Sequence, residues 1–217
     1  MDAIPLLDPA SAALVIFGTL LATVLRCGRT ETRVALSALA HLFARPFDAV
    51  HARAELAIQV QEIEEDGLVR AEPHHIGDGE FDEMTDALLK TRSIEVLYER
   101  HTAHRIRRIE SARRAGAVLA SAAELAPVLG LVGTLISLGG LSTAVAADGD
   151  YARAIAMAVA TTLYGLVAAN FVFAPLAAVV ARRAEAEDRA REDVIAWLLA
   201  AVEASCQRQP ELARCAA

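Results

Sequence analysis

Long apolar stretches without a charge alternate with segments that are rich in arginine and acidic residues. The uncharged stretches are residues 9–25, 125–147 and 154–181, with lengths of 17, 23 and 28 residues. A helix needs about 20 apolar residues to cross the hydrocarbon core of a bilayer, which is roughly 30 Å thick. The first stretch is marginal and the other two are long enough, so the pattern predicts three transmembrane helices.

The charges beside these stretches predict the orientation of the helices. Arginines flank one end of each stretch: Arg26, Arg29 and Arg33 follow the first, Arg105, Arg107, Arg108, Arg113 and Arg114 precede the second, and Arg182, Arg183, Arg189 and Arg191 follow the third. The opposite ends are acidic, with Asp2, Asp8, Asp148 and Asp150. Because basic flanks stay in the cytoplasm, we expect the N-terminus outside and the C-terminus inside. The acidic start also disfavours a secretory signal peptide.

We therefore expect an all-α integral membrane protein, N-out and C-in, whose long helices extend into the cytoplasm. Its predicted parts are a periplasmic N-terminus (1–8), transmembrane helix 1 (9–27), a cytoplasmic helical segment (28–113), transmembrane helix 2 with its cytoplasmic extension (114–147), a periplasmic loop (148–153), transmembrane helix 3 (154–181) and a cytoplasmic C-terminal helix and tail (182–217). The short loop makes transmembrane helices 2 and 3 antiparallel neighbours. Neither Gly nor Pro occurs from Phe81 to Ala115, so one unbroken helix is expected to lead from Phe81 into transmembrane helix 2.

Composition excludes several other classes of protein. The net charge of −7 says little about nucleic acid, because the acids lie mainly beside bunched arginines and no basic patch is interleaved with aromatic residues. Three cysteines on the predicted cytoplasmic side imply no disulfide framework. The pairs His74 and His75, and His101 and His104, lack further ligands at a metal-site spacing. No nucleotide loop, cofactor site or catalytic constellation is indicated, so we do not expect an enzyme.

Small and hydroxyl-bearing residues recur at helical spacing in two of the apolar stretches. One face of transmembrane helix 2 comprises Ala123, Pro127, Gly130, Thr134 and Ser137, and one face of transmembrane helix 3 comprises Ala158, Thr162, Gly165 and Ala169, before Asn170 and Pro175. Such faces serve either as packing surfaces or as the walls of a water-accessible path. The three stretches contain no Asp, Glu, His, Lys or Arg. If the chain conducts ions by means of a carboxylate, a partner must supply that group.

Three segments resemble one known family. "APVLGLVGTLISL" and "ATTLYGLVAANFVFAPLA" resemble the paired signature of the MotA/TolQ/ExbB proton-channel family, and "LDPASAALVIFGTLLATVL" resembles the second membrane helix of its MotA branch. The resemblance implies a homopentamer in the bacterial inner membrane around two single-span helices of a MotB/ExbD/TolR-like partner. An aspartate of that partner carries the ion, and ion flow drives mechanical work at the cell envelope. Membrane lipid is the remaining expected partner.

The resemblance also implies roles for individual residues. Thr134 and Thr162 match the threonines that face the partner's aspartate, and Pro127 and Pro175 match prolines that bend helices and couple conformational change. The small residues Ala123, Gly130, Ser137, Ala158, Gly165 and Ala169 would form the packing or pore face. Flagellar members use cytoplasmic charges to contact a rotor, and the candidates here are Lys90, Arg92, Glu95, Glu99 and Arg100. For any one of these charges, a solvated helix face is the simpler reading.

Three hypotheses follow from these patterns. Met157 stands where ExbB and TolQ carry a glutamate, which favours a MotA-like stator subunit, whereas the three-span count is that of ExbB and TolQ. An ExbB/TolQ-like energiser of outer-membrane transport or integrity is therefore the alternative. The third hypothesis is a non-conducting membrane scaffold whose small faces only pack. Protons are favoured over sodium by the resemblance alone.

Overall fold

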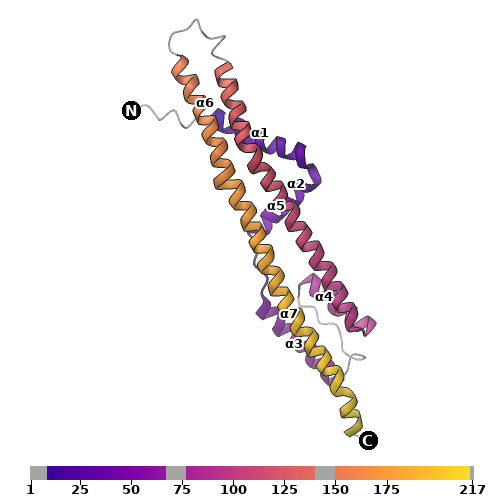
Figure 1. The fold of residues 1–217 in the computed structure, drawn as a ribbon. Helices are drawn as coiled ribbons and strands as arrows, with labels where there is room; N and C mark the ends of the chain where they lie inside the picture. The colour runs from indigo at the N-terminus through magenta and orange to yellow at the C-terminus, as the bar shows by residue number, and fades with distance from the viewer. Residues whose placement is uncertain (1–8, 67–76, 140–149, 216–217) are drawn as a thin grey trace. The chain divides into compact units, whose positions relative to one another are not determined.

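The structure is a computed structural model that describes residues 9–66, 77–139 and 150–215, and every regular element in these ranges is a helix (Figure 1). The elements are α1 (Pro9–Cys27), α2 (Arg29–His41), α3 (Ala49–Asp66), α4 (Gly79–Thr91), α5 (Ile94–Gly139), α6 (Asp150–Val167), the π-helical segment η2 (Ala168–Phe173) and α7 (Ala174–Cys215). The predicted all-α fold is thus confirmed for the described residues. The predicted N-terminus (1–8), residues 140–149 at the predicted loop, and His74 with His75 lie outside these ranges.

The chain forms two compact units. Unit 1 comprises Met1–Ala44 and Ser111–Arg183, and unit 2 comprises Arg45–Glu110 and Ala184–Ala217. Within the described ranges, two helical stretches are long and apolar enough to cross a membrane, Ile94–Gly139 and Ala154–Ala204, and a shorter apolar helix covers Ser11–Cys27. The second and third predicted spans therefore lie in suitable helices, while the first span, the orientation and the boundaries of the parts stay predictions.

Helix α1 in unit 1 exposes large apolar side chains and buries small polar ones, which is the reverse of a helix in a soluble domain. Its buried face carries Ser11, Val15, Thr19 and Thr23, and it packs against α6. Large apolar side chains cover its exposed face: Leu14, Ile16, Phe17, Leu20, Leu21 and Leu25. The hydroxyls of Thr19 and Thr23 donate to carbonyls one turn earlier, at 2.6 and 2.7 Å, so neither needs water. Small polar side chains inside and large apolar ones outside suit a lipid-facing helix.

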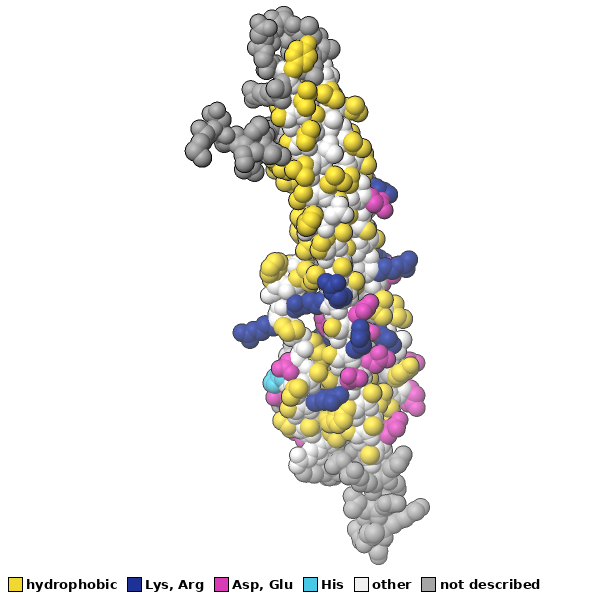
Figure 2. Space-filling view, turned by 60° about the vertical axis from the view of Figure 1, so that its left-hand side comes forward, with side chains coloured by type: hydrophobic (Ala, Val, Ile, Leu, Met, Phe, Trp, Pro, Cys, Tyr) yellow, Lys and Arg dark blue, Asp and Glu magenta, His cyan; other side chains and the backbone are white. Residues whose placement is uncertain are grey.

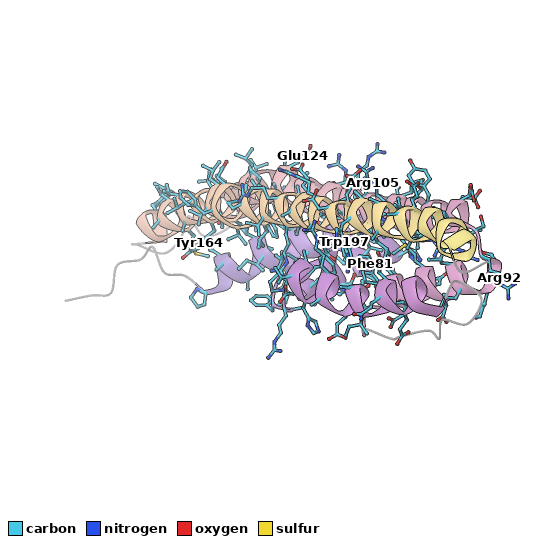
Figure 3. All side chains as sticks on the ribbon, turned by 90° about the horizontal axis from the view of Figure 1, so that it is seen from below. Phe81, Arg92, Arg105, Glu124, Tyr164 and Trp197 are labelled. Carbon is cyan, nitrogen blue, oxygen red and sulfur yellow. The ribbon has the colours of Figure 1, made fainter. Side chains whose placement is uncertain are left out.

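Unit 2 has a hydrophobic core of its own, built from α3, α4, the start of α5 and the C-terminal part of α7. Its buried members include Leu56, Phe81, Met84, Leu88, Leu97, Val194, Leu198 and Val202, with Trp197 packed against them (Figure 3). The apolar residues of α3, α4 and α7 recur at helical spacing because one stripe of each helix faces this core. Unit 2 therefore buries one apolar stripe of these helices in a shared core, while Val50, Tyr98 and Ile106 stay 79%, 60% and 61% exposed.

The prediction of one unbroken helix from Phe81 into transmembrane helix 2 is wrong. Helix α4 ends at Thr91 and α5 begins at Ile94. Between them Arg92 adopts a left-handed conformation with φ 56°, and its N–H donates to the carbonyl of Leu88 at 2.7 Å. This is a common way to end a helix, but glycine or asparagine usually occupies the position. An arginine gives no such signal in the sequence.

Candidate functional site

Glycines bring α5 and α6 into backbone contact within unit 1. A β-carbon at Gly165 would lie 2.6 Å from the carbonyl oxygen of Ala126, and one at Gly130 would lie 2.9 Å from the carbonyl oxygen of Thr161. Both distances are far shorter than a van der Waals contact, and both neighbours are backbone atoms that no rotamer change can remove. Only glycine permits this approach, as in other closely packed membrane helices. We call the contact the glycine seam, formed by Gly130, Gly133 and Gly165.

Three threonine hydroxyls meet beside the glycine seam. Thr134 Oγ1 on α5 lies 2.7 Å from Thr162 Oγ1 and 3.5 Å from Thr161 Oγ1, both on α6. Thr134 Oγ1 also lies 3.1 Å from the carbonyl oxygens of Gly130 and Ala158. A hydroxyl donates one proton and accepts through two lone pairs, so Thr134 can donate to a carbonyl while Thr162 donates to Thr134. The backbone carbonyls of two helices thereby fix the positions of both hydroxyls.

Thr134 and Thr162 line a groove on the surface of unit 1. The groove has a volume of about 520 Å³, and its other lining residues are Leu138, Ile155, Ala158, Val159, Leu163 and Leu166. Both threonines are half-buried, whereas Thr161 is 1% exposed and lies behind them. The accessible hydroxyls can accept a hydrogen bond from a protonated carboxyl group or, after rotation, donate to a carboxylate. They can do so without placing a fixed charge in an apolar wall.

Charged side chains stay away from this groove. Residues 125–139 and 154–181 contain no acidic or basic side chain, and Figure 2 shows apolar and small side chains over the end of unit 1 that holds α6. The nearest acid along α5 is Glu124, which forms a salt bridge with Arg26 of α1 at 3.1 Å (Figure 3). Among the described residues, the lining of the groove therefore contains no acidic side chain.

The residues of the two predicted small faces do not all share one environment. Four of them are buried: Gly130, Ala158, Gly165 and Ala169. Ala123 and Ser137 are half-buried, and the Ser137 hydroxyl donates to the carbonyl of Gly133 in its own helix at 2.9 Å. The glycines thus lie in the contact between helices, whereas Ala123 and Ser137 flank it.

Sequence reasoning missed Gly133 and Thr161. A β-carbon at Gly133 would lie 2.9 Å from both Cβ and Cγ2 of Thr161, so these two residues extend the glycine seam. Each lies one position away from the face that was predicted from steps of 3 and 4 residues. The repeat of Gly130 and Gly133 three positions apart was the available signal, because residues i and i+3 lie on adjacent parts of one helix face.

Pro127 lies next to the glycine seam, because its Cα would lie 3.2 Å from a β-carbon at Gly165. It lies inside α5, where a proline removes one backbone hydrogen bond of the helix. The structure therefore brings Pro127 together with the glycines and places it two turns before Thr134 on the same helix.

Pro175 lies just after the π-helical segment η2. Proline has no N–H to donate and its ring crowds the carbonyl one turn earlier, here that of Phe171. In η2 each backbone hydrogen bond spans five residues and not the four of an α-helix, so the N–H of Ala174 donates to the carbonyl of Ala169. The side-chain amide of Asn170 donates to the carbonyl of Leu166 at 2.9 Å. Short π-helical turns of this kind occur frequently at functional sites.

Three of the five predicted cytoplasmic charges are engaged within unit 2. Lys90 Nζ lies 3.9 Å from Asp86 Oδ2, and Arg100 Nη1 lies 2.7 Å from Glu83 Oε1. Glu95 accepts a hydrogen bond at 2.6 Å from the hydroxyl of the serine two residues earlier, which holds the pKa of this carboxyl below its ordinary value. These charges have a structural explanation without a partner protein.

The other two charges, Arg92 and Glu99, are exposed, and their side chains have no partner among the residues that the structure describes. Arg92 lies at the turn between α4 and α5 (Figure 3), and Glu99 lies in the second turn of α5. The structure thus divides the five candidates into three that are paired and two that are available for an intermolecular contact.

A buried ion pair fastens the start of α4 to α7 within unit 2. Arg191 is 9% exposed and donates to both oxygens of Asp78 at 3.1 and 2.8 Å. Its guanidinium group lies 4.3 Å from the centroid of the Phe47 ring. Burial by itself would raise the pKa of Asp78, but the hydrogen bond and charge of Arg191 outweigh burial and hold that pKa below its ordinary value. The same partner raises the pKa of Arg191 against the effect of burial.

His101 is the buried histidine of unit 2, at 5% exposed. Burial and then the positive charge of Arg108 lower its pKa, so the neutral form is favoured. His104 instead lies 3.1 Å from an oxygen of Glu83. The two histidines, which the sequence places one turn apart, therefore lie in different surroundings: His101 is buried, and His104 lies beside a carboxylate.

Comparisons with known proteins identify the family. The family profile described as the MotA/TolQ/ExbB proton channel family matches residues 78–193, which is more than half of the chain. Motility protein A of Treponema phagedenis is 36% identical over 78 residues, which are 36% of this chain and 30% of that protein. The uncharacterized protein YtxD of Bacillus subtilis (strain 168) is 33% identical over 107 residues, which are 49% of this chain and 35% of that protein. The match spans about a third of each curated relative.

Solved structures show the same fold. A chain of the flagellar MotAB stator complex from Bacillus subtilis superposes with a TM-score of 0.78 and 21% identity, over 92% of this chain and 80% of that one. A chain of C. jejuni MotAB superposes with a TM-score of 0.76 and 17% identity, over 93% and 79% of the two chains. The apolar helices and this family together make the chain a membrane protein, as the sequence motifs predicted. This chain is a member of the MotA/TolQ/ExbB proton channel family.

Proposed function

We propose that this chain is a MotA-like subunit of a proton channel in the bacterial inner membrane, where it converts the proton-motive force into mechanical work. The observation that carries the proposal is the pair of hydroxyls of Thr134 and Thr162, 2.7 Å apart in an apolar groove. The family and the similarity to chains of MotAB structures support it.

In this proposal a single-span, MotB-like partner places an aspartate against the two hydroxyls. A neutral carboxyl group enters an apolar groove at low cost, whereas a carboxylate is expensive to bury unless it is hydrogen-bonded. Thr134 and Thr162 supply such hydrogen bonds and carry no charge that would trap the carboxylate. The aspartate can then alternate between the two states as a proton enters from one side and leaves on the other.

The proposed assembly is a pentamer of this chain around two partner helices. Large apolar side chains of α5 support the need for neighbours, since Leu131, Leu135 and Ile136 are 56%, 70% and 58% exposed. Exposed apolar side chains inside a membrane face lipid or another helix. In this proposal the exposed side chains of α5 pack against a helix of a neighbouring subunit or of the partner. We further propose that Arg92 and Glu99 contact the driven component in the cytoplasm, because both lack a partner within the described chain.

Replacing the two hydroxyls tests the channel. Thr134→Val and Thr162→Val keep the shape of the side chain and remove the hydroxyl, whereas Thr134→Ser and Thr162→Ser keep the hydroxyl and serve as matched controls. We expect the valine variants, purified with the partner chain, to lose most of their proton flux in proteoliposomes, and the serine variants to retain it. A buried hydroxyl group that loses its partner typically costs about 1–3 kcal/mol, which corresponds to a slowing of roughly 5- to 150-fold.

The same experiment separates the channel from a non-conducting scaffold. Unchanged flux and function in valine variants that still assemble would overturn the proposal and favour the scaffold. Identification of the co-purified partner distinguishes the two kinds of motor. A peptidoglycan-binding partner supports the MotA-like reading, whereas a partner linked to TonB or TolA supports an ExbB/TolQ-like energiser.

A further inference from the structure

Helix α2 and the turn that follows it bury only one of their two apolar faces. The buried face comprises Ala35, Ala38, Leu39 and Leu42, which pack against α5 and α7 in the core of unit 1. The opposite face, at steps of 4, 3, 4 and 3 residues, comprises Arg29, Arg33, Leu36, Ala40 and Phe43, all of them exposed. Leu36 is 68% and Phe43 is 93% exposed. We call this second set the outer face of α2.

The two arginines of the outer face have no partner in the chain as described. The side chains of Arg29 and Arg33, one turn apart, form neither an ion pair nor a hydrogen bond with any described residue. Glu31 lies between them in sequence but points to Arg114 of α5, at 3.8 Å. Two guanidinium groups are therefore available on one side of α2, next to exposed apolar side chains.

The ends of the outer face are joined to the ends of the apolar helices. Gly28, with φ 85°, is the single residue between α1 and α2, so Arg29 lies four residues after the first apolar stretch, which ends at residue 25. At the other end, Arg183 donates to the carbonyls of Leu42 and Ala44 at 2.9 and 2.6 Å. Arg183 itself lies two residues after the apolar stretch that ends at residue 181. Both ends therefore lie where apolar sequence gives way to charged sequence, which in a membrane protein is the headgroup region.

The charge of this region favours a negatively charged occupant. At the arginine-bearing ends of the apolar stretches, unit 1 has Arg26, Arg29, Arg33, Arg113, Arg114, Arg182 and Arg183, and the acidic residues there are Glu31 and Glu124. Guanidinium groups bind phosphate through two parallel hydrogen bonds, and apolar side chains beside them can enter the boundary between headgroups and acyl chains. The negatively charged phosphate surface that a membrane protein meets at this level is the anionic leaflet.

We propose that the outer face of α2 binds anionic phospholipid, with Arg29 and Arg33 on the phosphate and Leu36 and Phe43 at the edge of the acyl chains. The site anchors α2, and through Arg183 the end of the third apolar stretch, to the lipid surface. It depends on insertion of the chain into a membrane and not on ion conduction. Two arginines at an anionic surface correspond to a roughly 30-fold preference over zwitterionic lipid.

A fluorescent reporter at the outer face tests the proposal. Trp197 is the single tryptophan of the chain, so Phe43→Trp in a Trp197→Phe background places a single reporter on the outer face. The full chain is reconstituted into phosphatidylcholine vesicles that contain acyl-brominated phosphatidylglycerol or acyl-brominated phosphatidylcholine at equal mole fraction. We expect the anionic lipid to quench the reporter with an association constant about 30 times that of the zwitterionic lipid.

Matched charge variants complete the test. Arg29→Gln with Arg33→Gln should bring the ratio of the two association constants close to 1, whereas Arg107→Gln with Arg189→Gln, an equal charge change in unit 2, should leave it unchanged. If the first pair fails to fold, high salt on the reporter protein should lower the same ratio, because salt screens exposed charges. Equal quenching by both lipids, or an equal loss in both variant pairs, overturns the proposal. Quenching by neither lipid, together with a photo-cross-link between two chains at position 43, assigns the outer face to a second copy.

Discussion

Gly165→Ala tests whether the glycine seam sets the position of the threonine pair. The added β-carbon would meet the carbonyl oxygen of Ala126 at 2.6 Å and the Cα atoms of Gly130 and Pro127 at 3.2 Å. All three neighbours are backbone atoms, so α5 and α6 have to move apart to make room. An ordinary contact begins near 3.4 Å, which means that the closest pair is about 0.8 Å too close.

Two opposing effects decide the stability of this variant. Alanine is favoured over glycine inside a helix by about 1 kcal/mol. Overpacking typically costs about 1–3 kcal/mol, and backbone neighbours that cannot rotate place this substitution at or above the upper end of that range. We expect a net loss of about 2 kcal/mol, which for a chain of this size lowers the melting temperature by roughly 4–8 °C.

The separation of the helices also weakens the hydrogen bond between the two threonines. Their oxygens are 2.7 Å apart, and a displacement of this size takes them to the distance at which a hydroxyl hydrogen bond is lost. Thermal melting of the purified chain in detergent measures the first effect, and proton flux with the partner chain measures the second. We expect Gly165→Ala to lower both the melting temperature and the flux.

Gly116→Ala is the matched control, because it makes the same change in α5 where nothing lies within 4 Å of the added β-carbon. We expect it to retain the flux and to melt at the same or a higher temperature. A Gly165→Ala protein that melts and conducts like the unmodified chain would refute the reasoning. An equal loss in both variants would also refute it, because that result would show a general intolerance of alanine.

Unit 2 offers two further predictions. The pKa of Asp78 is lowered in the folded chain, so its stabilising contribution is complete above its unfolded pKa of about 3.9 and is lost as the pH falls through the folded value. Melting temperatures recorded against pH should therefore fall at acidic pH, and Asp78→Asn should reduce that dependence; an identical dependence in the variant would contradict the assignment. Arg92→Ala and Glu99→Ala should leave the melting temperature unchanged, because neither side chain has a described partner, while lowering the output of the motor in cells. Loss of output without loss of flux identifies a contact with the driven component, and unchanged output in both variants would count against it.

Helical spacing and composition account for much of the threonine site. The first apolar run is followed by Arg26 and then by Gly28, which predicts a helix over 9–27. Helix α1 covers Pro9–Cys27. Placing Thr134 and Thr162 on the small faces of neighbouring antiparallel helices leads directly to their contact. The sequence did not predict the roles of Gly133 and Thr161. The positions that join a helix contact depend on the distance and the crossing angle between the two helices, and a single sequence does not specify either quantity.

The breaks in the long helices were harder to predict. A proline predicts a local disturbance of the helix, and Pro175 lies just after the π-helical segment η2. Whether the chain forms a kink or a π-helical turn depends on which backbone carbonyls accept hydrogen bonds from other donors. Here the amide of Asn170 serves the carbonyl of Leu166. The break at Arg92 has no sequence signal at all, because a non-glycine residue adopts the left-handed conformation only where its surroundings favour it.

The threonine pair is rigid, and this constrains the origin of any conformational change during ion transfer. Thr134 Oγ1 lies 3.1 Å from a carbonyl oxygen of α5 and 3.1 Å from one of α6, either of which can accept its single proton, and the two backbones are already in contact at the glycine seam. A hydroxyl pair held in this way cannot titrate and has little freedom to move. Under the proposed function, the group that changes charge is therefore the partner's carboxyl, and we expect movement of this chain to arise outside the seam. Pro127 interrupts the hydrogen-bond ladder of α5 next to the seam, and on the other helical path η2 begins three residues beyond Gly165, with Pro175 ten residues beyond it.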